Sequence, residues 1–144
     1  MKSKKQGFTL VEIMIVIVII AVLAAAIIPQ FTDSTNDARE STARFNLQTL
    51  RGQLEVYRAQ HLGQYPPTLA DLARRTNADH TITGTPTLGP YCFEIPSDAV
   101  TDTSTVTAST ANPIGGTIAG TAGGWIYNAT TGELRINHKD YDEM

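Results

Sequence analysis

The amino-acid sequence predicts an α+β fold, in which one long N-terminal helix packs on a small antiparallel β-sheet. An apolar run near the N-terminus is followed by apolar residues at helical spacing, and both patterns indicate helix. Two β-prone segments near the C-terminus flank a short turn, which is typical of a hairpin. At 144 residues the chain has room for one compact domain and one long helix, and not for two large cores.

The apolar run extends from Phe8 to Ile28 and is interrupted only by Thr9 and Glu12. As a helix, this run would be about 31 Å long, which is the thickness of the hydrocarbon core of a membrane. Three lysines precede the run. Because positive charge favours the cytoplasmic side, we expect a cytoplasmic N-terminus and a C-terminal domain on the other side.

The residues alone leave more than one interpretation of this segment open. A secretory signal peptide could be cleaved at the small residues Ala24–Ala26, which would release an exported binding domain. A single-span anchor, carrying an enzyme or a receptor, would need only the apolar run. Neither interpretation accounts for Glu12, because a carboxylate in a spanning helix costs up to roughly 3 kcal/mol at mid-membrane depth.

The stretch Gly7-Phe8-Thr9-Leu10-Val11-Glu12 resembles the processing site of type IV prepilins and of the pseudopilins of type II secretion. The resemblance implies that a prepilin peptidase cuts after Gly7 and methylates the new amino terminus at Phe8, and that the apolar helix is kept. It also implies that Glu12 pairs with the terminal ammonium of a neighbouring subunit. In low dielectric such an ion pair is strongly favoured over two isolated charges, so an unpaired Glu12 favours docking of a neighbour.

Pro29 follows the apolar run directly. It lacks an amide hydrogen and its ring clashes with the carbonyl four residues earlier, so we expect a helix kink at this position. The resemblance implies that the helix unwinds there when subunits pack into a filament. A simple end to the membrane helix is the alternative.

The segment after Pro29 is amphipathic, and we expect the helix to continue to about His61 and to end near Leu62–Gly63. Its apolar stripe has spacings of four, three, four and three residues and consists of Ala43, Leu47, Leu50, Leu54 and Tyr57. The chain is thus predicted to have a basic leader peptide (1–7), a membrane or filament-core helix (8–29), an amphipathic continuation (30–62) and a small β-rich globular domain (63–144).

Within the globular domain, Thr68–Asp71 reads as a capping box that opens a short helix. Trp125–Asn128 and Glu133–Asn137 are the predicted hairpin strands, and Tyr91–Ile95 is expected to complete a three-stranded antiparallel sheet. The Thr- and Gly-rich segment Val100–Gly124 is expected to be a loop, with a weak strand near residues 103–107.

Leu54–Arg58, Tyr65-Pro66 and Leu69–Leu72 together look like the major pseudopilin of type II secretion. That resemblance implies an acidic, Gly-rich calcium loop near the C-terminus, and the sequence has no such spacing. The disulfide-bounded loop of many adhesive type IV pilins is also missing, because Cys92 is the only cysteine. We expect Cys92 to be a small buried apolar residue.

The sequence offers little for catalysis or for ligand binding. His61, His80 and His138 are scattered without ligand spacing, so neither a metal site nor a cofactor is expected. Asn128-Ala129-Thr130 matches the glycosylation acceptor pattern, which often occurs by chance. No catalytic constellation can be proposed, so the protein is not expected to be an enzyme.

The sequence therefore predicts a structural subunit of a type IV pilus-like filament, with a type II secretion pseudopilin favoured over a surface type IV pilin. The expected partners are further copies of the chain, the prepilin peptidase, an inner-membrane assembly platform and membrane lipid. The chain would cross the bacterial inner membrane once, with its C-terminal domain periplasmic or extracellular. No nucleic acid is expected, because the chain beyond its three N-terminal lysines is acidic.

Overall fold

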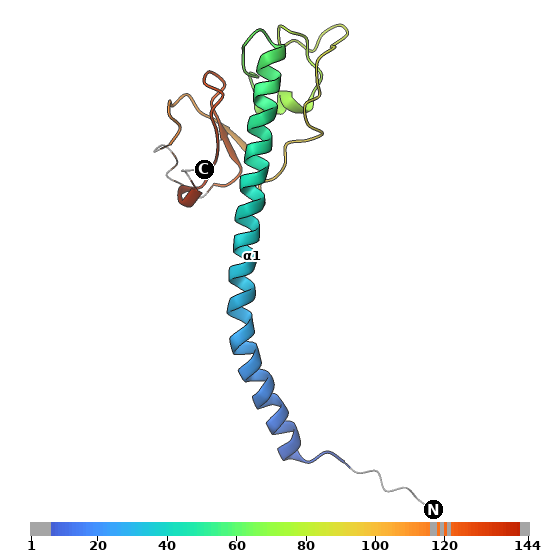
Figure 1. Cartoon of the computed structure of the whole chain (residues 1–144), viewed down its shortest axis with the longest axis vertical. Coiled ribbons are helices and arrows are strands. Elements are labelled where there is room, and N and C mark those ends of the chain that lie inside the picture. The colour runs from blue at the N-terminus through green and yellow to red at the C-terminus, as the bar shows by residue number, and fades with distance from the viewer. Residues whose placement is uncertain (1–6, 116–117, 119, 121, 142–144) are drawn as a thin grey trace, which may run out of the picture. The chain divides into compact units, whose positions relative to one another are not determined.

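The computed structural model describes residues 7–115, 118, 120 and 122–141. These belong to two compact units, Met1–Ala38 and Arg39–Met144, and helix α1 (Leu10–Gln60) contributes to both (Figure 1). The remaining elements all belong to the second unit. They are η1 (Leu69–Ala73), β1 (Val106–Ala108), β2 (Trp125–Tyr127), β3 (Leu134–Ile136) and η2 (Lys139–Tyr141), where η denotes a 3₁₀ helix.

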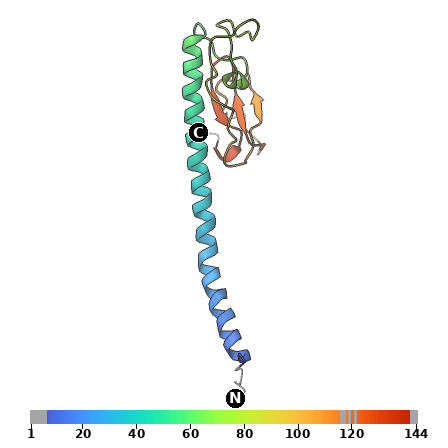
Figure 2. The same cartoon turned by 90° about the vertical axis from the view of Figure 1, so that its right-hand side faces the viewer.

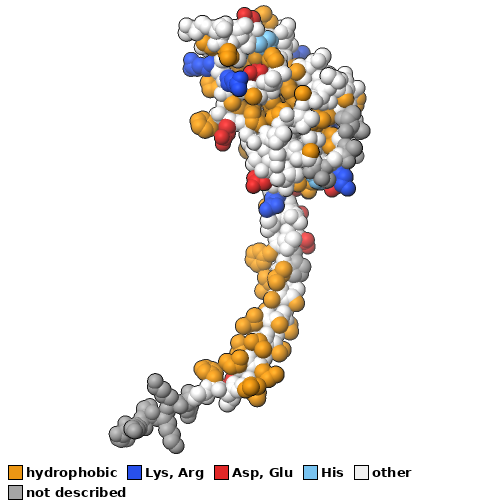
Figure 3. Space-filling view, turned by 180° about the vertical axis from the view of Figure 1, so that it is seen from behind, with side chains coloured by type: hydrophobic (Ala, Val, Ile, Leu, Met, Phe, Trp, Pro, Cys, Tyr) orange, Lys and Arg blue, Asp and Glu red, His pale blue; other side chains and the backbone are white. Residues whose placement is uncertain are grey.

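In the first unit, many apolar side chains of α1 lie on the face that Figure 3 shows. Every large apolar side chain from Phe8 to Ile28 is between 47% and 84% exposed. Within this region, an 18-residue window has a mean hydropathy of 3.2, and none of it is buried. The helix is therefore long and apolar enough to cross a membrane, and this apolar surface has no partner among the described residues.

Helix α1 runs through Pro29 without interruption. Two threonine hydroxyls near this proline donate hydrogen bonds to backbone carbonyls one turn earlier, Thr32 to Ile28 at 3.2 Å and Thr35 to Phe31 at 2.8 Å. Hydroxyl groups that bond backwards in this way often bend helices. Unwinding of the helix at Pro29 on assembly stays a prediction.

The core of the second unit forms between α1 and the sheet, which lie side by side (Figure 2). The predicted stripe on α1 is confirmed, since all five of its residues are at most 2% exposed. Against it pack the aromatic and aliphatic side chains of β2 and β3 and two leucines of η1, namely Trp125, Tyr127, Leu134, Ile136, Leu69 and Leu72.

The sheet has the order β1-β2-β3 and is mixed, so the prediction of an antiparallel sheet was wrong in one pair. β2 and β3 are antiparallel, with Trp125 opposite Ile136, and this confirms the hairpin. β1 pairs parallel to β2, with Val106 opposite Trp125. A parallel pair requires a connection of about a dozen residues or more, and the segment between Ala108 and Trp125 is long enough to supply it.

Residues 91–95 do not form the predicted third strand. The amides of Tyr91 and Cys92 both donate to the carbonyl of Leu72, at 2.8 and 3.1 Å, so they are fixed to the end of η1 instead of to a neighbouring strand. Pro96, which follows this segment, has no amide to continue a ladder. The weak strand expected near residues 103–107 takes this place in the sheet, displaced to Val106–Ala108.

Capping interactions are present at the end of α1 and at the start of η1. The amide of Gly63 donates to the carbonyl of Arg58 at 2.9 Å, and Gly63 has a φ of +83°, which glycine adopts without strain. The amide of Thr68 donates to the Asp71 carboxylate at 3.0 Å. The capping interaction expected at Thr68 is therefore present, although the element it opens is a short 3₁₀ helix.

Candidate functional site at the start of α1

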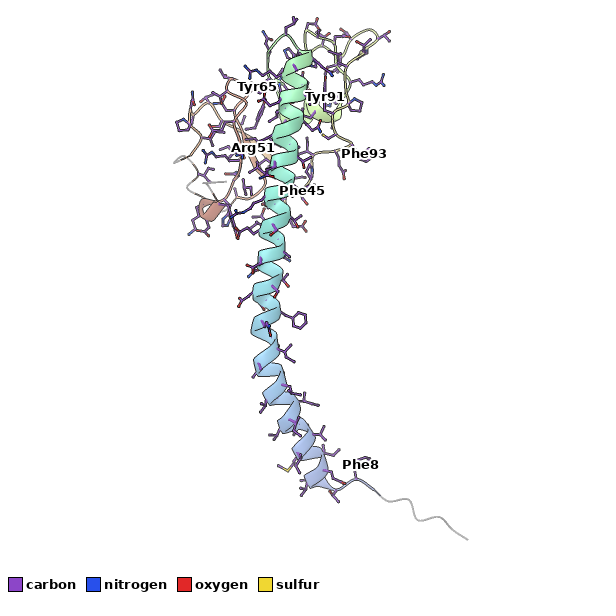
Figure 4. All side chains as sticks on the ribbon, viewed as in Figure 1. Phe8, Phe45, Arg51, Tyr65, Tyr91 and Phe93 are labelled. Atoms are coloured by element: carbon purple, nitrogen blue, oxygen red, sulfur yellow. The ribbon has the colours of Figure 1, made fainter. Side chains whose placement is uncertain are left out.

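The predicted cleavage site lies in exposed, non-helical backbone. Gly7 and Phe8 precede the first turn of α1, which begins at Leu10, and the Phe8 side chain is 84% exposed (Figure 4). A peptidase needs an accessible bond outside regular helix, so this backbone is suited to cleavage. The other residues of the expected leader, 1–6, lie outside the described residues.

Glu12 caps the N-terminus of α1 together with Thr9. One carboxylate oxygen of Glu12, Oε2, accepts the backbone amide of Thr9 at 2.8 Å and its hydroxyl at 2.9 Å. The amide of Glu12 donates to the Thr9 hydroxyl oxygen at 3.3 Å. This reciprocal pattern is a capping box, and the helix dipole further favours a negative charge in the first turn.

The second carboxylate oxygen, Oε1, has no hydrogen-bond partner among the described residues. Glu12 thus presents one oxygen held by its own chain and one oxygen open to a donor from outside. A carboxylate in this state is only partly satisfied, and in an apolar environment a cation beside it would be strongly stabilising.

Thr9 is the capping residue that sequence reasoning missed. Its signal is local, because Thr9-Leu10-Val11-Glu12 has the Ser/Thr-x-x-Glu spacing of a capping box and stands directly before an apolar run. The carboxylate of Glu12 therefore has a hydrogen-bond partner three residues earlier in the chain.

Comparisons with known proteins find a family model that matches the N-terminal segment and several similar proteins. A family model described as "Prokaryotic N-terminal methylation motif" matches residues 2–28. The type II secretion system core protein G of Pseudomonas aeruginosa is 33% identical over 67 residues, which is 46% of each chain. A fimbrial protein of Neisseria meningitidis is 35% identical over 79 residues, covering 54% of this chain and 46% of that protein.

The competence protein ComGC of Halalkalibacterium halodurans is 33% identical over 77 residues, which is 54% of this chain and 74% of that protein. The chain belongs to the type IV pilin-like family. It spans about half the length of the type II secretion relatives that it matches, such as 46% of the Pseudomonas aeruginosa protein. No solved structure matches it.

Two of the three histidines of this pilin-like chain lie together, contrary to the prediction that all three are scattered. The rings of His61 and His80 are stacked, with centroids 5.1 Å apart and planes 18° apart. Sequence spacing could not show this, because the turn that brings His80 back to α1 is not local. In the part of the chain that the structure describes, no three His, Cys, Asp or Glu residues could together hold a metal ion.

The glycosylation pattern falls on a buried structural side chain. Asn128 is 2% exposed. Its side-chain nitrogen donates to the carbonyl of Ala111 at 2.7 Å, and its side-chain oxygen accepts the amides of Thr130 and Thr131 at 2.8 and 3.2 Å. Asn128 therefore tethers the loop before β2 and is not accessible for modification.

Cys92 is half-buried against the core, and burial raises the pKa of its thiol. A raised thiol pKa lowers the fraction of thiolate, which is the reactive form. The expectation of a buried side chain is met only in part.

An open groove of about 340 Å³ lies between η1 and β1, lined by Leu69, Val106, Ala108 and Tyr127 together with other uncharged residues. None of its lining side chains is a carboxylate, histidine, cysteine or lysine. Of the side chains that act as general acids or bases, the lining offers only the hydroxyl of Tyr127, which donates a hydrogen bond to the carbonyl of Pro66 at 2.9 Å.

Proposed function

We propose that this chain is a structural subunit of a type IV pilus-like filament, and specifically a pseudopilin of a type II secretion system. The observation that carries this proposal is the start of α1, where an exposed Gly7–Phe8 bond precedes an apolar helix whose first turn holds Glu12. The methylation motif matched over residues 2–28 and the similarity to core protein G support it.

In this function the chain is made as a precursor in the bacterial inner membrane. Residues 1–7 remain on the cytoplasmic side, and the domain after α1 is periplasmic or extracellular, as the three N-terminal lysines favour. The prepilin peptidase hydrolyses the Gly7–Phe8 bond and methylates the new amino group of Phe8. A methylated secondary amine stays protonated at neutral pH, so it keeps the positive charge that assembly requires.

Assembly then pairs the ammonium group of Phe8 in one copy with Glu12 of a neighbour. Oε1 of Glu12 is the oxygen open to this contact, while Thr9 holds Oε2 and with it the orientation of the carboxylate. Two charges that meet in a low-dielectric environment attract strongly, and each alone is penalised there. The pairing would therefore favour insertion of each new copy at one axial position of the filament, beside an inner-membrane assembly platform.

Pro29 supplies the flexibility that packing of such helices requires. Its ring and missing amide remove one hydrogen bond within α1, which weakens the helix locally by about 3 kcal/mol. We propose that α1, which is continuous through Pro29 in the subunit, unwinds there when neighbouring copies pack against it.

A surface type IV pilin is the second candidate, favoured by the similarity to a fimbrial protein. Both candidates use the same processing site and differ in the filament that results.

Mass spectrometry of the N-terminal peptide of the native protein, from membranes and from sheared filaments, tests the proposal. We expect a peptide that begins at N-methyl-Phe8. Its abundance in the sheared fraction would favour a surface pilus, and its restriction to membranes would favour the short pseudopilus. A soluble protein that begins at Ile27, or a membrane form that still begins at Met1, would overturn the filament function.

A further inference from the structure

The face of the sheet that packs on α1 is left open at β1. In β2 this face carries the buried side chains of Trp125 and Tyr127, which belong to the core. The register places Val106 beside Trp125 and Ala108 beside Tyr127, so these two residues of β1 lie on the same face. Both are nevertheless exposed. The core therefore has an uncovered apolar margin at β1.

This margin forms one wall of the open groove between η1 and β1. Leu69 and Tyr127 also line the groove and are at most 3% exposed, so they lie at its base. The rest of the lining consists of alanine, proline, serine and threonine residues. A lining without charged side chains favours an uncharged, apolar occupant, because a charged group would lose its water there without gaining a partner.

β1 also offers a free backbone edge, since it is the outer strand in the order β1-β2-β3. The carbonyl of Thr105 and the amide of Ser109 both bond to β2, each at 2.8 Å. Because backbone groups alternate in direction along a strand, those of Val106 and Ala108 point away from β2. Such an edge can bind a further extended segment of chain through main-chain hydrogen bonds.

Phe93 is the most exposed large hydrophobic side chain among the described residues, at 93%. In the view of Figure 4 it projects from the side of the domain. The amides of Phe93, Glu94 and Ile95 donate to no described residue. Burial of a phenylalanine ring is favourable, and aromatic rings are prominent at the centres of protein interfaces. Residues 93–95 thus offer a partner both an apolar ring and free backbone donors.

We propose that Phe93 of one copy occupies the groove between η1 and β1 of the next copy, with residues 93–95 alongside the free edge of β1. This inference rests on the proposed function, because only repeated copies bring the two surfaces together. The groove, about 340 Å³ in volume, has room for an aromatic ring. There the ring would pack on Leu69 and Tyr127, and aromatic pairs gain more than their buried area alone provides.

A second copy is the occupant that fits a chain of this family. Phe93 does not line the groove of its own chain, so the two surfaces are separate and neither is its own partner. A head-to-tail contact of this kind leaves a free groove at one end and a free Phe93 at the other. It therefore propagates into a ring or a filament, whereas a contact between two identical surfaces would close a dimer.

The other exposed apolar side chains of the second unit suit the groove less well. Phe45 and Val56 project from α1, where the helix already uses the backbone amides and is too wide to lie along a strand edge. Leu62 and Ile82 are aliphatic and less exposed than Phe93, at 86% and 59%. They would not gain the aromatic contact with Tyr127.

Cysteine cross-linking in intact cells tests the contact. In a chain that carries Cys92→Ser, Phe93→Cys is combined with Ala108→Cys on β1 or with Ala70→Cys on η1, which both line the groove. Mild oxidation should give a ladder of disulfide-linked multimers from at least one of these pairs. The matched pair of Phe93→Cys with Thr107→Cys should give none, because Thr107 is also exposed but projects from the opposite face of β1.

The absence of a ladder from both groove pairs, or an equal ladder from the Thr107 control, would overturn the contact. Protection of Ala108→Cys from a maleimide in cells, without any cross-link to position 93, would show that a lipid or another molecule fills the groove. That result would also overturn the contact. The peptide that begins at N-methyl-Phe8 in the wild type reports on the proposed function separately, so the two can fail independently.

A truncation of the ring gives a second, independent test. Phe93→Ala should weaken each contact between copies by roughly tenfold or more, as for a central aromatic residue of an interface, and filament yield should fall. Because the ring is 93% exposed, the urea midpoint of the full chain in detergent should not change. Ile82→Ala, which also removes exposed apolar atoms, should assemble normally. An unchanged filament yield from Phe93→Ala would contradict the proposal.

Discussion

At the scale of single residues, the proposed function gives the two carboxylate oxygens of Glu12 separate tasks. Oε2 caps α1 through Thr9, and Oε1 is open to a partner outside the described residues. A cap contributes about 1 kcal/mol to a helix, whereas an ion pair in low dielectric determines whether the charge is tolerated at all. The two tasks can therefore be separated by the choice of substitution.

We predict that Glu12→Gln and Glu12→Ala both abolish filaments while membrane insertion and cleavage at Gly7 remain. The glutamine keeps an oxygen for the Thr9 bonds and loses only the charge, whereas alanine loses both. Electron microscopy of sheared material, with immunoblots of membranes, measures the outcome. Glu94→Gln, a substitution of an exposed glutamate in the second unit, should assemble normally. Filaments from Glu12→Gln would show that capping, and not charge, is what assembly requires.

At the scale of elements, the two faces of α1 in the second unit differ in their energetic role. Leu54 is 1% exposed and packs in the core, while Val56, two residues further on, is 45% exposed. We predict that Leu54→Ala lowers the free energy of unfolding by about 2–5 kcal/mol, because it removes packed atoms and leaves a cavity. The matched Val56→Ala should change it by no more than about 0.5 kcal/mol.

Urea unfolding followed by fluorescence measures both variants, since Trp125 is the single tryptophan and is fully buried in the same core. Its signal therefore reports on the second unit alone. Equal losses from the two alanines would show that this face of α1 is not the one that packs.

The elements that sequence reasoning placed correctly are those whose signal is local. Helical spacing alone identifies the stripe from Ala43 to Tyr57, and alternation around a turn identifies β2 and β3. The third strand, β1, depends on a pairing between residues that are distant in sequence, because a long connection separates Val106 from its partner in β2. The strand propensity of β1 itself is also weak. Tyr91–Ile95 has good strand composition, yet its amides are fixed by Leu72, which the sequence does not reveal.

The same distinction applies to the candidate sites. The Gly7–Phe8 bond and Glu12 are visible in the sequence as a motif, and the Thr9 cap could have been read from its spacing. The contact of Tyr57 with His61 also follows from their spacing of four residues on a helix. The approach of His80 to both does not, because it depends on a turn whose geometry is set by the packed domain.

At the scale of the whole molecule, the two units need different surroundings. In Met1–Ala38 the large apolar side chains between Phe8 and Ile28 are exposed, so this unit requires lipid or other copies of the helix. In Arg39–Met144 the hydrophobic core draws all of its residues from between Ala43 and Tyr141. The stability of the second unit should therefore not depend on the first.

We predict that a fragment of residues 39–144 folds in water, with a urea midpoint close to that of the full chain in detergent. Every buried side chain of the core is retained, and only exposed apolar surface is removed. Circular dichroism and Trp125 fluorescence measure this. The matched fragment 53–144 lacks Ala43, Leu47 and Leu50, three of the buried residues that α1 supplies, and should stay unfolded. If the longer fragment is unfolded as well, residues 1–38 stabilise the domain, and the two units are one cooperative structure.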